Sequence, residues 1–134
     1  EAGVAGGEAA AREAADTAGS IISDGASKLA IARWIRSRSI TPEWIGQGIN
    51  LNAVAPGMIA TAMIDEGRAD PILSKALDNF EIPVGRMGSA QEIADLICFM
   101  LGDKGRFMVR SIAYIDAGTD AHYRTDACPP PTHQ

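Results

Sequence analysis

Asp24 and Lys28 are the two residues whose types and spacing suggest chemistry. They stand four residues apart in "SDGASKLAIARW", residues 23–34, and would share one face of a helix. A carboxylate held beside an ammonium group can accept a proton, although an exposed aspartate titrates at about 3.9 and is a weak base. The same pair is also typical of a surface ion pair, with the acid satisfying backbone N–H groups at a helix start. The sequence favours this structural role and leaves the catalytic one open.

Apolar spacing and capping residues predict the helices. A helix is expected over residues 25–38, with much of its surface in need of cover. The dipeptide "DP" at residues 70–71 predicts the start of a short helix, because proline is favoured in the first turn. In "SAQEIADLICFMLG", residues 89–102, a serine followed three residues later by a glutamate predicts a capping box, and the closing glycine predicts the helix end. The apolar positions of the first helix are Leu29, Ile31, Ala32, Trp34 and Ile35.

Two short stretches are predicted to be β-strands. "INLNAVAPG", residues 49–57, has alternating side chains and is stopped by its proline and glycine, and "SIAYID", residues 111–116, is a short apolar run. A strand, a helix and a second strand in this order imply a parallel pair with a right-handed crossover. In open α/β sheets ligands bind at the carboxyl ends of such strands. We therefore expect a site where the chain leaves the first strand.

Charge and cysteine usage exclude several classes of function. The formal net charge of −5 argues against nucleic acid or an anionic membrane as partner, and no apolar run approaches membrane-spanning length. His122 and His133 lack the spacing of metal ligands, so no metal site is expected. Cys98 and Cys128 form no spacing motif, and we interpret both as free thiols in a reducing cytoplasm.

Composition divides the chain into three segments. Residues 1–23 are rich in alanine and glutamate and are expected to be flexible or helical; their "GVAGG" does not follow a strand, which argues against a phosphate-binding loop. Residues 24–121 carry the predicted strands and helices. Residues 122–134 end in "CPPPTHQ" and are predicted to be a disordered tail.

Four motifs in a fixed order then point to a family. "GASK", "NAVAPG", "GRMGSAQEIADLICFML" and "YIDAG", within about residues 20–121, resemble the C-terminal half of a short-chain dehydrogenase/reductase. The Ala- and Glu-rich stretch before the first motif and the closing "DAGTDA" resemble bacterial hydroxysteroid dehydrogenases and carbonyl reductases. The resemblance implies an α/β fold, the C-terminal part of a Rossmann-like doubly wound parallel sheet, with the N-terminal dinucleotide half absent. It also implies descent from an NAD(P)-dependent oxidoreductase acting on an alcohol or ketone such as a hydroxysteroid.

The resemblance carries site residues with it. Lys28 matches the catalytic lysine, which in the family holds the nicotinamide ribose and lowers the pKa of a neighbouring tyrosine. The "PGxxxT" segment lines the nicotinamide, and residues 58–80 match a mobile loop that covers substrate. The cofactor-binding residues implied in this way are Lys28, Pro56, Gly57, Ile59 and Thr61.

Departures from the family pattern weigh against activity. Asp24 occupies the position of the tyrosine that exchanges a proton with substrate, and the catalytic serine and the glycine-rich dinucleotide loop have no counterpart. At neutral pH an aspartate has no proton to donate, and its carboxylate ends roughly 3 Å short of a tyrosine hydroxyl. Carbonyl reduction by the family mechanism should therefore fail. Arg110, before the last strand, and Ala117, in "DAG", each stand where the family has glycine.

The expected protein is thus a catalytically disabled relative of a dehydrogenase. Its cofactor would be NAD or NADP, unless this chain binds none. One alternative is a non-enzymatic oligomerisation or regulatory module of that family, and another is cofactor-free proton transfer by Asp24. Because the family pairs subunits through the lysine helix and through the last helix and strand, the expected partner is a second copy or a chain that supplies the N-terminal half.

Overall fold

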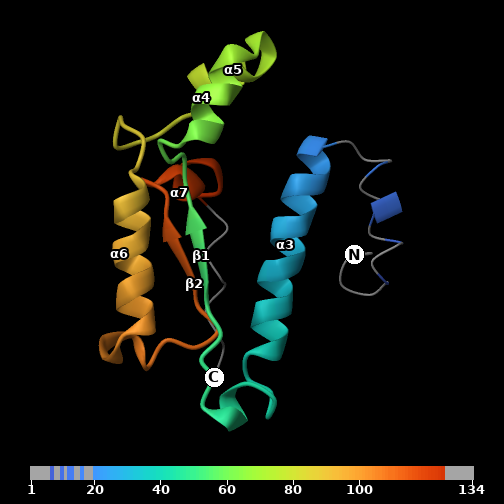
Figure 1. Ribbon diagram of the computed structural model, residues 1–134, viewed down its shortest axis with the longest axis vertical. Coiled ribbons are helices and arrows are strands. Elements are labelled where there is room, and N and C mark those ends of the chain that lie inside the picture. The colour runs from blue at the N-terminus through green and yellow to red at the C-terminus, as the bar shows by residue number, and fades with distance from the viewer. Residues whose placement is uncertain (1–6, 8–9, 11, 14–15, 17–19, 126–134) are drawn as a thin grey trace. The chain divides into compact units, whose positions relative to one another are not determined.

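A computed structural model describes residues 7, 10, 12–13, 16 and 20–125 (Figure 1). The described residues form two compact units: those up to Ala53 together with Arg106–Ile112, and Val54–Gly105 together with those from Ala113 onward. The predictions for the glycines of residues 3–6, for Cys128 and for His133 lie outside the described residues. The elements in chain order are α3 (Ser20–Arg38), η1 (Ile45–Gln47), β1 (Ala53–Pro56), α4 (Ala62–Ala69), α5 (Pro71–Asp78), α6 (Ala90–Leu101), η2 (Asp103–Gly105), β2 (Ile112–Ile115) and α7 (Thr119–Tyr123).

Helix α3 of the first unit begins at Ser20, earlier than the predicted start at residue 25. Asp24 therefore lies in the second turn, where the backbone N–H groups already have helical partners, and its interpretation as a cap at the helix start is wrong. Arg36 and Arg38 occupy the last turn, where positive charge complements the helix dipole. No helix among the described residues is long and apolar enough to span a membrane.

The broad apolar surface of α3 is mostly uncovered. Ile35 is 6% exposed and is the one buried apolar side chain in the described part of the chain. Leu29 and Ile31 remain 51% and 59% exposed. Beyond the helix, Trp44 meets Trp34 edge to face, with ring centroids 5.8 Å apart, and so holds the following turn against α3.

Side-chain amides organise the approach to β1. The predicted strand starts at residue 49, but β1 covers only Ala53–Pro56. Before it, the Nδ2 atoms of Asn50 and Asn52 each donate to a backbone carbonyl of residues 106–108 at 2.7 Å. The Oδ1 atom of Asn52 in turn accepts the N–H of Ser111 at 3.0 Å. These amides take over hydrogen bonds that a longer strand would make through its backbone, which explains the short strand.

β1 and β2 form a parallel pair, as predicted. The N–H of Ala53 donates to the carbonyl of Ser111 at 2.9 Å, and the N–H of Gly57 donates to that of Ile115 at 3.1 Å. Both strands advance by the same number of residues in the same direction between these bonds, which is the parallel arrangement. Their carboxyl ends therefore meet, and the backbones come so close that a Cβ at Gly57 would lie 2.6 Å from the Cα of Asp116.

Three α-helices and the short η2 of the second unit connect the two strands. α6 has the predicted capping box: the N–H of Ser89 donates to Glu92 Oε2 at 2.8 Å, and the Glu92 N–H donates to the Ser89 hydroxyl at 3.2 Å. α5 has the predicted start at Asp70, whose carboxylate accepts two backbone N–H groups. α4 was not predicted, and its N-cap Thr61 makes no side-chain capping bond. In Figure 1, α6 runs beside the strands, and α4 and α5 lie beyond the carboxyl end of β1.

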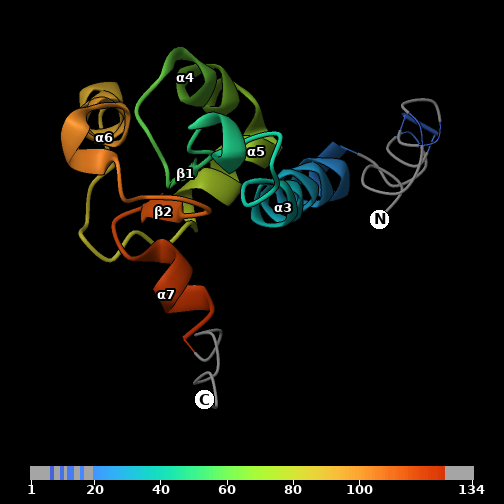
Figure 2. The same ribbon diagram turned by 90° about the horizontal axis from the view of Figure 1, so that it is seen from below.

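Among the described residues, two that are not glycine adopt the left-handed conformation. Arg110 has φ = 62° and Ala117 has φ = 59°. These are the two positions where the family pattern has glycine, the residue that adopts this conformation without strain. The second of them begins the turn into α7, and Figure 2 shows α6 and α7 on different sides of the strand pair. His122 and Tyr123, placed by the sequence in the tail, belong to α7.

Candidate functional site

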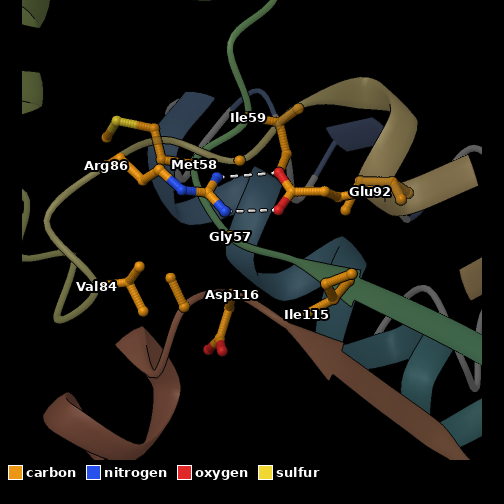
Figure 3. Close-up of a pocket in the computed structure, with 11 residues that line it drawn as sticks. Gly57, Met58, Ile59, Val84, Arg86, Glu92, Ile115 and Asp116 are labelled. Carbon is orange, nitrogen blue, oxygen red and sulfur yellow. Dashed lines mark hydrogen bonds and ion pairs between the residues drawn. The ribbon is translucent and has the colours of Figure 1, made fainter. Parts of the chain in front are cut away.

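A pocket of about 230 Å³ opens at the carboxyl ends of β1 and β2, where the sequence predicts a site (Figure 3). It lies within the second unit. Its walls come from the segment after β1, the loop before α6, the first turn of α6 and the turn after β2. The lining is largely apolar with three charged side chains and consists of Gly57, Met58, Ile59, Val84, Arg86, Gly88, Glu92, Ile93, Ile115, Asp116 and Ala117.

Arg86 and Glu92 form a two-pronged ion pair on one wall. Arg86 Nη2 lies 2.7 Å from Glu92 Oε1 and Nη1 lies 3.1 Å from Oε2, and Figure 3 shows the two side chains reaching toward each other. Hydrogen bonds from Arg86, and then from the backbone and hydroxyl of Ser89, lower the pKa of Glu92 to about 2. The same contact raises the pKa of Arg86. The pair is therefore fully ionised at neutral pH, and each charge already has the other as its partner.

Asp116 is the other acid of the pocket, and its oxygens have structural partners. Oδ1 accepts the N–H of Gly118 at 3.0 Å, and Oδ2 accepts the N–H of Asp120 at 2.6 Å. In Figure 3 its carboxylate points away from Arg86 and Glu92. These bonds hold the turn into α7. Asp116 thus shapes the pocket and is not a free general base.

Only some of the predicted "PGxxxT" residues line the pocket. Gly57 and Ile59 line the pocket, and Gly57 is required there by the close approach of Asp116. Pro56 is the exposed last residue of β1 and does not line the pocket. Thr61 is exposed at the start of α4 and lies outside it as well. The structure brings two of the four implied residues of this segment together in one cavity.

Asp24 and Lys28 belong to the first unit and contact each other directly. Lys28 Nζ lies 2.7 Å from Asp24 Oδ2, the expected pair one helical turn apart. Both side chains are largely exposed, Lys28 at 73% and Asp24 at 61%. The hydroxyl of Ser27 donates to the Asp24 carbonyl at 2.8 Å. The ammonium group that the resemblance assigns to a nicotinamide ribose thus already has a carboxylate partner.

Sequence reasoning missed most of the pocket walls. No sequence pattern indicated that Val84, Arg86, Glu92 and Asp116 would be neighbours of Gly57. The one available signal was the strand order, since both carboxyl ends must meet at the same edge. Cys98 is an exposed free thiol, as predicted. Among the described residues, no three His, Cys, Asp or Glu side chains gather where they could hold a metal ion.

A dinucleotide fits this pocket only in part. The volume lies below the 300–1,000 Å³ or so of ordinary ligand sites, which suits a single ring more than a whole dinucleotide. The backbone of residues 57–59 reaches the cavity at a parallel strand end, the usual place for a nucleotide. No glycine-rich turn opening a helix, the feature that holds a pyrophosphate, occurs among residues 20–125.

Comparison with known proteins identifies the family. A family model described as Enoyl-(Acyl carrier protein) reductase matches residues 8–120. The chain belongs to the short-chain dehydrogenase/reductase family. It is 32% identical to a 3-alpha-hydroxysteroid dehydrogenase/carbonyl reductase of Comamonas testosteroni, over 90% of this chain and 47% of that protein.

Solved structures of this short-chain dehydrogenase/reductase family agree with the fold. The 3-alpha-hydroxysteroid dehydrogenase of Pseudomonas sp. B-0831, complexed with NADH, matches with a TM-score of 0.70 at 33% identity, over 76% of this chain and 39% of that one. A putative 2-deoxy-d-gluconate 3-dehydrogenase of Agrobacterium tumefaciens with bound NADP matches with a TM-score of 0.60 at 33% identity, over 72% and 38%. The chain thus spans less than half the length of these relatives, as expected for part of a Rossmann-like domain.

Proposed function

We propose that this chain carries the nicotinamide-side part of an NAD(P)-dependent oxidoreductase for an alcohol or ketone, and that Asp24 disables its carbonyl reduction. The observation that carries the proposal is the 2.7 Å contact between Asp24 and Lys28. In the family the residue one turn before the lysine donates a proton to the substrate oxygen. Here a carboxylate stands at this place and accepts a hydrogen bond from Lys28, so it is arranged as an acceptor and not as a proton donor.

The geometry of the pair adds a second obstacle. The Lys28 ammonium group donates a hydrogen bond to Asp24, so it is less available to a ribose hydroxyl. The Asp24 side chain contacts Lys28 of the same helix. Its carboxylate also ends roughly 3 Å short of where a tyrosine hydroxyl would lie, which is about the length of a hydrogen bond. The first effect weakens the hold on the ribose, and the second acts on the delivery of a proton to a carbonyl oxygen; both leave the pocket of the second unit unchanged.

Binding of a dinucleotide end is supported by the second unit. The residues after β1 contribute Gly57 and Ile59 to the pocket, and two similar solved structures are complexed with NADH or with NADP. We propose weak nicotinamide binding by this chain and full dinucleotide binding only with an N-terminal half.

The partner is proposed to be a second copy or a chain with that N-terminal half. In the first unit Leu29 and Ile31 are more than half exposed on α3, and in the second unit Phe99 and Leu101 are 45% and 83% exposed on α6. Uncovered apolar helix faces of this kind favour association. The exposed thiol of Cys98 supports a reducing, cytoplasmic location as part of the same proposal.

A hybrid protein tests the catalytic loss. The N-terminal half of the Comamonas relative would be joined to this chain, with Asp24, Asp24→Tyr or Asp24→Asn. NADH and NADPH binding is followed by energy transfer from Trp34 and Trp44, and ketone reduction by loss of NADH absorbance. We expect all three hybrids to bind cofactor and only the tyrosine variant to turn over. Equal turnover with Asp24 and Tyr would overturn the proposal.

The hybrids and the 134-residue chain by itself also separate the remaining functions. Cofactor-free proton transfer by Asp24 predicts turnover without NADH that is lost in Asp24→Asn. A non-enzymatic oligomerisation or regulatory module, which the exposed apolar faces favour, predicts that the 134-residue chain forms a stoichiometric complex with the full-length relative in sedimentation velocity and binds no NADH up to millimolar concentration. Saturable micromolar NADH binding by the chain alone would exclude this second function.

A further inference from the structure

Glu92 is the centre of a set of hydrogen bonds on one wall of the pocket (Figure 3). Its Oε2 atom accepts the Ser89 N–H at 2.8 Å and the Ser89 hydroxyl at 3.1 Å. Oε2 also accepts a bond from Arg86 Nη1 at 3.1 Å, and Oε1 accepts one from Nη2 at 2.7 Å. Nη1 donates in addition to the carbonyl of Met87 at 3.1 Å. These bonds connect the start of the loop at residues 86–89 to its end and to the first turn of α6.

The same loop carries Gly88, which is bound to the segment after β1. The Gly88 N–H donates to the carbonyl of Met58 at 2.9 Å, and the Ala60 N–H donates to the carbonyl of Gly88 at 2.9 Å. These two bonds make a parallel bridge between Ile59 and Gly88. The Ile59 side chain also lies against the glycine, because a Cβ at residue 88 would be 2.6 Å from Ile59 Cδ1.

Ile59 lies between these two bonds and lines the pocket. The bridge uses the polar groups of its neighbours, and its own N–H and carbonyl have no hydrogen-bond partner among the described residues. In the extended backbone of a bridge, these two groups point to the same side of the chain. They place a donor beside an acceptor, which is the complement of a primary carboxamide. The bridge to Gly88 sets the direction in which they point.

We infer that Arg86 and Glu92 are positioning residues that orient the backbone of Ile59 toward a nicotinamide carboxamide. They fix the loop that carries Gly88, and the bridge from Gly88 fixes Ile59. This role rests on the proposed function, because it concerns the cofactor end that is assigned there to the pocket.

The ion pair is suited to orientation more than to stability. The Arg86 and Glu92 side chains are 61% and 42% exposed, and exposed ion pairs usually contribute little to the free energy of unfolding. Their two-pronged geometry, however, fixes the direction of both side chains. Variants of the pair should therefore stay folded and show their effect at the bridge.

Substitution of either partner breaks the ion pair without removing the helix cap. Glutamine at residue 92 keeps an oxygen for the Ser89 N–H, whereas its amide nitrogen cannot accept a bond from Arg86. Arg86→Gln leaves Glu92 and its capping box in place. In NMR of the 134-residue chain without cofactor, we expect the Gly88 amide to exchange with solvent about three- to tenfold faster in both variants, the fold-change that accompanies loss of roughly one ordinary hydrogen bond.

Two ligands separate orientation of the nicotinamide from a general loss of structure. In the hybrid that keeps Asp24, calorimetry measures the dissociation constants of NADH and of ADP-ribose, which lacks the nicotinamide ring. We expect Glu92→Gln and Arg86→Gln each to weaken NADH binding about three- to tenfold and to leave ADP-ribose binding unchanged. The double variant should be no weaker than either single variant, since both changes act through one bridge.

Arg124→Gln is the matched control. Arg124 also belongs to the second unit, pairs with Asp120 and does not line the pocket, so its loss should change neither affinity. Unchanged NADH binding or unchanged Gly88 exchange in both pocket variants, or equal weakening of NADH and ADP-ribose, would overturn the role of the pair. A parent hybrid that binds NADH no more tightly than ADP-ribose would instead overturn the proposed function itself.

Discussion

Replacing Arg110 by glycine should stabilise the first unit, because Arg110 is held in a conformation that suits glycine. Its φ of 62° places it in the left-handed region, and its N–H donates to the carbonyl of Leu51 at 3.0 Å, which fixes that geometry. A side chain costs about 1–2 kcal/mol in this conformation. Glycine has more conformational freedom in the unfolded chain, which offsets about 0.5–1 kcal/mol of the stability gained by relieving this strain. The expected net gain is about 0.5–1 kcal/mol.

Little is lost with the arginine side chain itself. It is exposed, and within the described part of the chain it makes no hydrogen bond or ion pair. Arg110→Ala is therefore the matched control, because it removes the charge and keeps the Cβ that causes the strain. Arg110→Ala should leave the stability nearly unchanged, whereas Arg110→Gly should raise it.

Urea unfolding followed by tryptophan fluorescence measures this difference in the correct unit, since Trp34 and Trp44 lie in the same unit as residue 110. The midpoint should rise for glycine at an unchanged slope with urea concentration, which marks a change in stability and not in the extent of unfolding. A glycine variant no more stable than the alanine variant would refute the reasoning from backbone strain.

Three further predictions concern other sites. Gly57→Ala should destabilise the second unit by about 2–3 kcal/mol in thermal unfolding, because the new Cβ would lie 2.6 Å from backbone atoms of Asp116 that cannot move away. A melting temperature within a degree of the parent would contradict this. Ser39→Ala should stabilise the first unit by about 1 kcal/mol, since Ser39 is fully buried and its hydroxyl has no hydrogen-bond partner among the described residues. A loss of stability in urea unfolding would instead show that the hydroxyl makes a hydrogen bond. The Arg86 contact holds the pKa of Glu92 at about 2 against an ordinary value of 4.5, so its stabilising contribution is complete above about pH 4.5 and disappears as the pH falls toward 2. Glu92→Gln should flatten the stability curve in that window, and parallel curves for parent and variant would argue against the pair.

The elements that could be predicted from the sequence are those with strong local signals. The capping box at Ser89 and the aspartate–proline start at residues 70–71 act over a few residues, and both helices begin where predicted. The parallel strand pair followed from the order of elements and needed no detail of contacts. Within the site, the same rule of strand ends placed Gly57 and Ile59 at a pocket.

What escaped prediction depends on contacts between residues distant in the chain. β1 begins later than predicted because the side-chain amides of Asn50 and Asn52 donate to backbone carbonyls 56 residues further along the chain. The pocket joins the ends of two strands to the loop before α6, and no periodic pattern reports such a meeting. Thr61 was expected beside Gly57, but the start of α4 places it on the exposed surface, outside the pocket.

The departures from the family pattern affect stability and chemistry separately. At Arg110 and Ala117 the chain keeps the backbone angles that family glycines would adopt, at a cost of about 1–2 kcal/mol each, which a fold with several kcal/mol of stability can tolerate. Under the proposed function Asp24 has no comparable tolerance, since proton transfer requires a donor within hydrogen-bond reach and in the right protonation state. The two effects should therefore respond to different substitutions. Asp24→Tyr in the hybrid should change turnover with little change in stability, and Arg110→Gly should change stability with no change in turnover.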